Sequence, residues 1–447
     1  MKTNKRMILI LIGFVLFVFG VWYLYYFRPI VDDELFNYGF AKSILDGRIP
    51  YLDFNMIIPP LFPILLSLVL GIFGEHLLVY HFLLVLFSLL VCYIAYLKIG
   101  YKAIALYALI LIYPYTGYNT FCLFLFMLLL YVADSDYKNK DLLEAIIISC
   151  MFLSKQTLGL LVIPSVVSSR HKKKVISVYA VSILLLVLYL LFNHNMFQFI
   201  DYCVLGMFNF ASKNSNFSGF FIAEVAVIIF LLFDGIKTKR KDVFYLLCFQ
   251  IIAFPIPNYI HFLIAFIPAL YYLFICFKKN FIGTIFFMGF SIAFFIIFSL
   301  ANYFVKFDYN FLSNYPVNNF MKGRISYSAT SSSIYNMSIQ LEKYSDYDVY
   351  VLGSFSYLVK LNLDMPIDKY DIINSGNMGY GGADRYIDEI DNKCKSEKCL
   401  FIINDAEALG KVHNQVDRSI LKYVINHYYQ EYSSDTFSIY VNKKQLF

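Results

Sequence analysis

Residues 7–34 read MILILIGFVLFVFGVWYLYYFRPIVDDE, an apolar run that ends in three acids. As a helix rising 1.5 Å per residue, the part from Met7 to Phe27 is about 30 Å long, which matches the hydrocarbon core of a bilayer. Carboxylates beside lipid are costly unless they are paired or used. Asp32, Asp33 and Glu34 are therefore predicted to open a functional segment directly behind a membrane anchor.

The composition of the whole chain is that of a membrane protein. Hydrophobic residues make up 60% of the chain and charged residues 15%, whereas soluble domains have about 45–50% apolar and about 25% charged residues. The apolar residues come in blocks of helical length, which predicts a polytopic α-helical membrane protein with about 11 transmembrane segments. The candidate segments are 7–27, 76–97, 103–113, 118–133, 142–153, 157–168, 175–192, 219–236, 243–254, 260–277 and 281–303.

Lysine and arginine are concentrated in every second loop between these segments. Because cytoplasmic loops carry the excess of these residues, a cytoplasmic N-terminus is predicted, and Asp32–Pro60 and the C-terminal region are expected on the extracytoplasmic side. The net charge of +6 then reflects topology, so no nucleic-acid partner is expected. Abundant Tyr, Phe, Ile, Lys and Asn with a single Trp are typical of an AT-rich bacterial genome, which favours a bacterial cell membrane.

Segment 142–168 must enter and leave the membrane from the cytoplasmic side, because basic loops flank it on both ends. Each half is only about 18 Å long as a helix, against about 30 Å of hydrocarbon. The tip of this hairpin, Ser154-Lys155-Gln156-Thr157, is therefore expected inside the membrane profile. Since a lipid-facing lysine costs about 2.5–3.5 kcal/mol, Lys155 should face a water-filled cavity or an anionic partner.

Segment 28–75 is predicted to form two helices outside the bundle. Leu35, Phe36, Phe40 and Ile44 share one face at helical spacing, and Gly47 suits the C′ position, so an amphipathic helix on the outer interface is expected. Met56–Phe73 is predicted to be a second interfacial or short re-entrant helix. An alternative role for the acids is helix capping, because carboxylates stabilise a helix N-terminus.

The motifs of this segment resemble the first extracytoplasmic loop of the GT-C glycosyltransferases, which include protein O-mannosyltransferases and undecaprenyl-phosphate aminoarabinose transferases. The matching residues are Asp33-Glu34, Ala41, Leu45-Asp46-Gly47, Pro50-Tyr51 and Pro59-Pro60-Leu61. Two further segments are similar to later family motifs: 152–157, and 259–262 with Pro268. The chain departs from the family at Ile57-Ile58, where relatives often carry Lys or His, so no phosphate contact is expected there.

The resemblance implies an inverting transfer of a sugar from a polyprenyl-phosphate carrier to an extracytoplasmic acceptor. Such chemistry needs a carboxylate base and a cation for the leaving phosphate. Asp33 is expected to be the base, with Glu34 or Asp32 orienting it. The expected substrate-binding residues are Lys155 and Arg28 for the phosphate, Asp53 as a second acid, and His261 and Tyr259 as cavity-lining residues.

Each substrate-binding residue also has a purely structural interpretation, which stays open at this point. Lys155 could tie helices together through a carbonyl, and Arg28 could snorkel to the interface from the first anchor. Asp53 could be a turn residue, His261 a hydrogen-bonded group at a helix start, and Tyr259 an interface tyrosine.

No cofactor is predicted with certainty. The chain has no His/Asp/Glu cluster at transition-metal spacing, so no metal ligands are assigned. A divalent cation, as in oligosaccharyltransferases, stays an open alternative.

Residues 304–447 have more charge and no long apolar runs, so they are predicted to form a separate α/β domain beyond a transmembrane domain of residues 1–303. Strands are expected at 349–353, 400–403 and 437–441, and helices at 384–394 and 415–428. Cys394 and Cys399 could form a disulfide if the domain is extracytoplasmic. The glycine-rich stretch 376–382 lacks the strand–GxGxxG–helix order of a dinucleotide site, so a loop is predicted.

The sequence thus favours a glycosyltransferase of cell-envelope or surface glycans, working on a polyprenyl-phosphate-linked sugar and a glycan, lipid or protein acceptor within the lipid bilayer. Two alternatives are a transporter or flippase of lipid-linked sugars, and a non-catalytic envelope scaffold. Transporters often have internal repeats and broken helices at the membrane midplane. This chain has no evident repeat, and its acids cluster outside the spans, which favours the enzyme.

Overall fold

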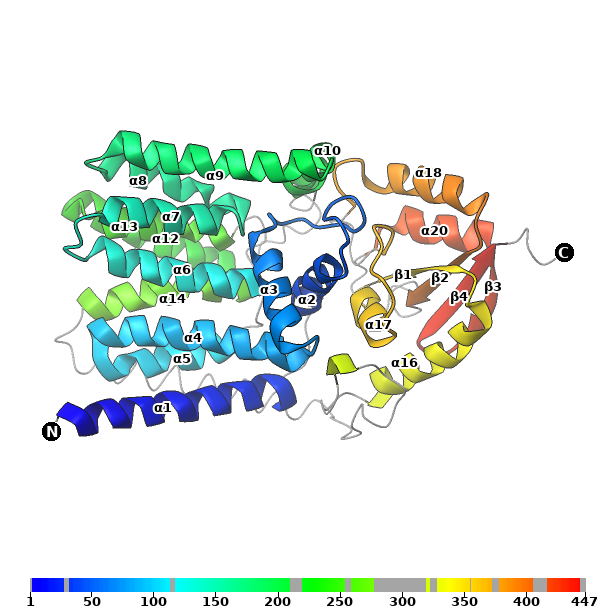
Figure 1. Ribbon diagram of the computed structural model, residues 1–447, viewed down its shortest axis with the longest axis horizontal. Coiled ribbons are helices and arrows are strands. Elements are labelled where there is room, and N and C mark those ends of the chain that lie inside the picture. The colour runs from blue at the N-terminus through cyan, green and yellow to red at the C-terminus, as the bar shows by residue number, and fades with distance from the viewer. Residues whose placement is uncertain are drawn as a thin grey trace.

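The computed structural model describes ten stretches of the chain: residues 2–27, 32–112, 117–209, 219–253, 259–276, 319–321, 328–353, 355–371, 378–404 and 416–442. The candidate span 281–303 and the predicted domain boundary at 303/304 lie outside these residues. Figure 1 shows a bundle of helices at the N-terminal end of the molecule and a small sheet domain at the C-terminal end, with α2 (Asp32–Leu45) and α3 (Leu61–Phe73) between them.

The helices of the bundle run roughly side by side in Figure 1, with α1 along one edge. They follow the apolar blocks of the sequence closely, because each block is long enough for several helical turns. Their bounds are α1 Lys2–Trp22 and η1 Tyr23–Phe27, α4 Leu77–Ile99, η2 Gly100–Lys102, α5 Ala103–Ile112, α6 Gly117–Ala133, α7 Lys140–Phe152, η3 Gln156–Leu161, α8 Val162–Ser168, α9 Lys172–Phe192, α10 Met196–Phe199, η4 Ile200–Leu205, α12 Gly219–Thr238, α13 Lys241–Phe249, η5 Gln250–Ala253 and α14 Tyr259–Cys276.

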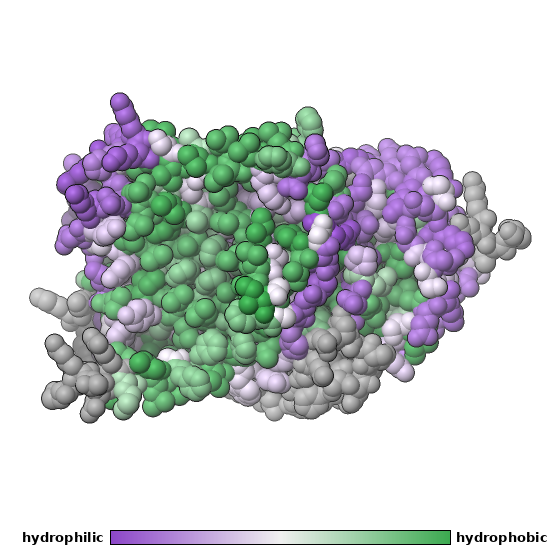
Figure 2. All heavy atoms as spheres, viewed as in Figure 1, coloured by the Kyte–Doolittle hydropathy of each residue, from purple (hydrophilic) through white to green (hydrophobic). Residues whose placement is uncertain are grey.

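Within the described stretches, three pieces of helix are long and apolar enough to cross a membrane: Met7–Tyr26, Leu77–Leu111 and Lys172–Phe192. Shorter apolar helices span Leu61–Phe73, Gly117–Ala133, Gln156–Ser168 and His261–Cys276. Figure 2 shows a broad hydrophobic belt over the bundle, with hydrophilic residues at its far end and over the sheet domain. These features support a membrane location, while the total of about 11 segments remains a prediction.

Helix α2 ends as the sequence predicts. Gly47 has a φ of 79°, and the Gly47 and Arg48 N–H groups donate to the carbonyls of Ile44 and Ser43 at 3.0 Å each. These two bonds form a Schellman motif, which needs a left-handed residue that glycine adopts without strain.

The environment of α2 differs from the predicted interfacial one, because the sheet domain covers it. Phe36 and Phe40 contact the ring of Tyr357 in α17 (Ser356–Asn362), with ring centroids 5.3 and 5.9 Å apart. Between them Gly39 lies so close to this domain that a Cβ there would come within 2.5 Å of the Tyr357 side chain. Helix α2 is therefore enclosed between the bundle and the C-terminal domain (Figure 1).

The C-terminal domain has a four-stranded sheet with helices on both faces. Its strands are β1 Asp348–Leu352, β2 Cys399–Asn404, β3 Tyr428–Ser433 and β4 Phe437–Asn442, in the order β1-β2-β4-β3. β1 and β2 are parallel, and the other two pairs are antiparallel. The three predicted strands and the helices α18 (Gly382–Cys394) and α20 (Arg418–His427) are confirmed, while β3, α16 (Ser328–Leu341) and α17 are additional.

Successive side chains of β2 point to opposite faces of the sheet and pack in two separate hydrophobic cores. Phe401 and Ile403 pack on one face of the sheet with Ile390 of α18 and Ile420 of α20. The neighbouring residues Leu400 and Ile402 point to the opposite face, where Met337 of α16 and Val359 of α17 pack. This two-residue period is what a strand requires when both of its faces are covered.

Cys394 and Cys399 form a disulfide that joins the end of α18 to the start of β2. We expect the Cys394→Ala/Cys399→Ala double variant to lose about 2 kcal/mol of domain stability, because the short closed loop removes little entropy from the unfolded chain. Thermal unfolding of the detergent-solubilised protein would measure the loss. Maleimide labelling of both cysteines in unreduced cells would contradict the bonded state.

Candidate active site

Asp33 lies in the first turn of α2, the helix that Figure 1 shows between the bundle and the C-terminal domain. Its side chain is half-buried, and within the described part of the chain no donor makes a hydrogen bond to its carboxylate. The backbone carbonyl of Asp33 accepts a 2.6 Å hydrogen bond from the Asn37 amide. Burial raises the pKa of the Asp33 carboxyl to about 6, and the positive charge of nearby Lys155 acts in the opposite direction.

Lys155 projects from the break between α7 and η3, where the backbone is extended. The side chain is buried, and its ammonium donates to Asn119 Oδ1 at 3.0 Å and to the Ile252 carbonyl at 3.3 Å. The ammonium also lies 5.5 Å from the centre of the Tyr118 ring. The described contacts of the Lys155 ammonium are thus neutral oxygens and a ring face, and Asp33 is the nearby acid that acts on its charge.

Gln156 follows Lys155 and fixes the same hairpin tip. Its Nε2 donates to the Ile57 carbonyl at 3.1 Å and to the Cys203 carbonyl at 2.9 Å. The tip is thereby tied to the segment that leads into α3 and to η4. The sequence placed Gln156 in the hairpin tip but contained no pattern that identified these two partners.

Glu34 points away from Lys155 toward α4. Both Glu34 and His81 are buried, and the His81 Nε2 forms an ion pair with the Glu34 carboxylate. The Tyr25 ring packs edge-on against His81, with ring centroids 5.8 Å apart. The pair joins α2 to the bundle and sets the rotation of α2, which in turn decides where Asp33 points. A single histidine inside an apolar block offered no sequence signal for this contact.

We expect His81→Leu to lower the stability of the protein by about 3–5 kcal/mol, because it leaves the buried Glu34 carboxylate without its imidazole partner. The Glu34→Leu/His81→Leu double variant should recover most of the loss, since both polar groups then leave the interior. Thermal unfolding in detergent compares the three proteins. A double variant no more stable than His81→Leu would contradict this account.

Of the other predicted site residues, Asp53 and His261 have described side chains. The Asp53 carboxylate accepts from the Ile49 N–H at 2.7 Å, and the Asp53 carbonyl accepts from Arg48 at 2.9 Å, as in a loop turn. His261 is half-buried near the start of α14. Arg28 and the side chains of Asp32 and Tyr259 lie outside the described residues. Within the described stretches, no group of three His, Cys, Asp or Glu residues could hold a metal ion.

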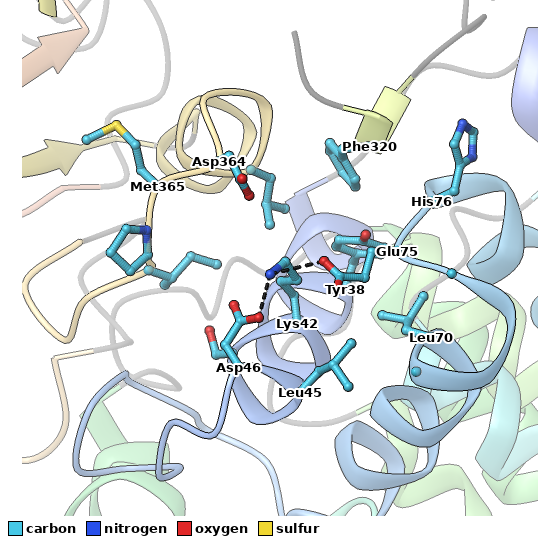
Figure 3. A pocket seen from close by; sticks show the side chains of 16 residues that line it. Tyr38, Lys42, Leu45, Asp46, Leu70, Glu75, His76, Phe320, Asp364 and Met365 are labelled. Carbon is cyan, nitrogen blue, oxygen red and sulfur yellow. Dashed lines mark hydrogen bonds and ion pairs between the residues drawn. The ribbon is translucent and has the colours of Figure 1, made fainter.

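A cavity of about 850 Å³ lies on another side of α2 (Figure 3). It is lined by Tyr38 and Lys42 of α2, by Glu75, and by segment 361–367 of the C-terminal domain. Lys42 forms ion pairs there with Asp46 at 2.5 Å and Glu75 at 3.1 Å. Lys42 follows Asp33 by about two and a half helical turns, so the two side chains leave α2 on opposite sides. The cavity is therefore separate from the Asp33–Lys155 site.

No protein-family profile and no curated protein sequence matches this chain. Solved structures do resemble it. ArnT from Cupriavidus metallidurans bound to undecaprenyl phosphate is 11% identical, with a TM-score of 0.58 over 100% of this chain and 99% of ArnT. The apo state of ArnT is 10% identical, with a TM-score of 0.55 over 99% and 98%.

A third structure is the Archaeoglobus fulgidus oligosaccharyltransferase in complex with Zn and sulfate. It is 13% identical, with a TM-score of 0.45 over 96% of this chain and 73% of the archaeal protein. The match to ArnT runs over practically the whole of both chains, so it includes the helical bundle, the two intervening helices and the C-terminal domain. The chain therefore has the fold of the GT-C membrane glycosyltransferases.

Proposed function

We propose that this chain is an inverting glycosyltransferase that moves a sugar from a polyprenyl-phosphate carrier to an acceptor on the extracytoplasmic side of a bacterial membrane. The fold supports a lipid-linked transfer, and one observation carries the proposal further. A half-buried carboxylate with a raised pKa, Asp33, lies near a buried cation, Lys155, whose described contacts are neutral oxygens and a ring face. The carboxylate can accept the proton that the acceptor hydroxyl releases, and the cation can stabilise the negative charge that develops on the leaving phosphate.

In the proposed reaction, Asp33 accepts the proton of an acceptor hydroxyl while the hydroxyl oxygen attacks the anomeric carbon. The bond between the anomeric carbon and the phosphate oxygen breaks, and its electron pair leaves with the polyprenyl phosphate. Lys155 faces the growing negative charge of this phosphate. A pKa of about 6 suits Asp33 for the task, because the carboxylate is ionised at neutral pH yet more basic than an ordinary aspartate.

Purified protein in proteoliposomes with undecaprenyl-phosphate monosaccharides tests the function. The proposal predicts consumption of one of these donors and release of undecaprenyl phosphate when envelope extract is added as acceptor. Deletion in the native host should make that donor accumulate while its sugar disappears from the envelope. Movement of intact donor across the bilayer without consumption would favour a flippase, and an unchanged donor pool in the deletion strain would favour a scaffold.

A further inference from the structure

Part of the glycine-rich stretch 376–382 packs against η4 and the residues after it. A Cβ on Gly379, whose φ is 73°, would collide with the Asp201 carboxylate, and a Cβ on Gly206 would lie 3.0 Å from the Gly379 Cα. The Asn209 amide donates to the carbonyls of Gly379 at 3.3 Å and Tyr380 at 2.9 Å. Only glycine permits this backbone approach, which gives the glycine-rich stretch a role that its sequence pattern did not reveal.

Arg385 of α18 contacts both η4 and the glycine-rich stretch. Its guanidinium forms an ion pair with Asp201 of η4 at 2.8 Å and lies 5.6 Å from the centre of the Tyr202 ring. The same guanidinium donates to the Met378 carbonyl at 2.8 Å. A half-buried arginine with three such contacts joins the C-terminal domain to η4 more firmly than an exposed ion pair would.

The next contact leads from η4 to the candidate active site. The carbonyl of Cys203, next to Tyr202, accepts from Gln156, and Gln156 adjoins Lys155. The tip that carries Lys155 lies between two short helical segments, so its position depends on such tertiary contacts. Arg385, Asp201, Cys203 and Gln156 thus form a continuous connection from the C-terminal domain to the hairpin tip that carries Lys155.

We propose that Arg385 and Gln156 are positioning residues: docking of the C-terminal domain through Arg385 fixes η4, and the Cys203 carbonyl then fixes the hairpin tip through Gln156. The inference rests on the proposed function for the role of Lys155. Through these two residues, the C-terminal domain helps to arrange the reaction centre. A 1 Å displacement of a positioned group can cost about 10²-fold in rate, so loosening this connection should lower turnover.

The buried Cys203 thiol reports on the connection without any enzyme assay. We expect Arg385→Ala and Gly379→Ala to raise the rate of maleimide labelling at Cys203 about tenfold, because both changes free η4 from the C-terminal domain. The partly or fully exposed free cysteines Cys150, Cys248 and Cys276 are replaced by serine in the background. Lys395→Ala is the matched control for Arg385, since the Lys395 ammonium contacts its sequence neighbours Asp391 at 2.8 Å and Asn392 at 3.3 Å. Gly382→Ala is the control for Gly379, because it has a φ of 63° but open space around it. Labelling of Cys203 in Arg385→Ala as slow as in its control would overturn the docking step.

Transfer assays test the positioning step separately. Gln156→Met and Arg385→Ala should lower kcat about tenfold and move the acid limb of the pH–rate profile upward, because a displaced Lys155 no longer holds down the pKa of Asp33. Lys395→Ala should leave both unchanged. If wild-type protein transfers sugar and Gln156→Met keeps the wild-type rate and profile, the positioning role is wrong while the function stands. If wild-type protein transfers no sugar, the function fails, and the Cys203 labelling still decides the docking.

Discussion

Asp33→Asn is expected to abolish measurable sugar transfer, with a loss of about 10²–10⁴-fold in kcat, because the amide cannot accept the acceptor's proton. The substitution preserves size and leaves the backbone bond from Asn37 in place, so the protein should fold and insert normally. Asp53→Asn is the matched control: the Asp53 carboxylate accepts from the Ile49 N–H of its own loop, so its replacement should keep most of the activity. Full turnover of Asp33→Asn would rule out the proposed base.

The pKa of the Asp33 carboxyl also predicts how the activity of the wild-type enzyme depends on pH. Asp33 can accept a proton only when its carboxyl is ionised. Activity should therefore be full well above its pKa of about 6 and fall tenfold per pH unit well below it. The profile of kcat/KM against pH measures this limb in the free enzyme. An acid limb near pH 4, the range of an unperturbed aspartate, would show that another group is the base.

Lys155→Met is expected to lower transfer about 10²–10³-fold, because the leaving phosphate loses the cation that we propose faces it. Residual activity should show a second effect. Since the Lys155 charge lowers the pKa of Asp33, its removal should raise that pKa and move the acid limb above pH 6. The shift distinguishes loss of a charge near Asp33 from general damage to the fold.

Lys42→Met is the control for this variant. Lys42 lies in α2, as Asp33 does, yet it faces the separate cavity, where Asp46 and Glu75 neutralise it. Its replacement should leave the acid limb unchanged. An unshifted limb in an active Lys155→Met protein would mean that Lys155 serves only as an interhelical tie to Asn119 and Ile252.

Local features of the fold could be predicted from the sequence, since they depend on neighbouring residues. The apolar blocks become helices, Gly47 ends α2, and the short apolar run 400–403 forms the inner strand β2. The edge strand β3 was missed, because Tyr428–Ser433 has little apolar content and is paired on one side only. The seven-residue helix α17 has too few turns to produce a clear helical period of apolar residues in the sequence.

The candidate site was predictable only in part. Loop charges placed Asp33 and Lys155 at the same end of the bundle, and the structure brings them near each other. The supporting contacts could not be predicted, because Glu34 with His81, Gln156 with Cys203, and Asp201 with Arg385 are each far apart in the chain. No periodicity encodes such pairs, so only the folded chain reveals them.

The fit of α17 over Gly39 has a consequence for biosynthesis. Helix α2 leaves the ribosome long before Tyr357 is made. During this interval α2 lacks the surface of α17 that encloses it in the folded protein. Its phenylalanines can rest on the lipid surface during that interval, which is the placement that the sequence alone predicts. We therefore expect the apolar face of α2 to rest on the bilayer in the nascent chain until the C-terminal domain closes over it.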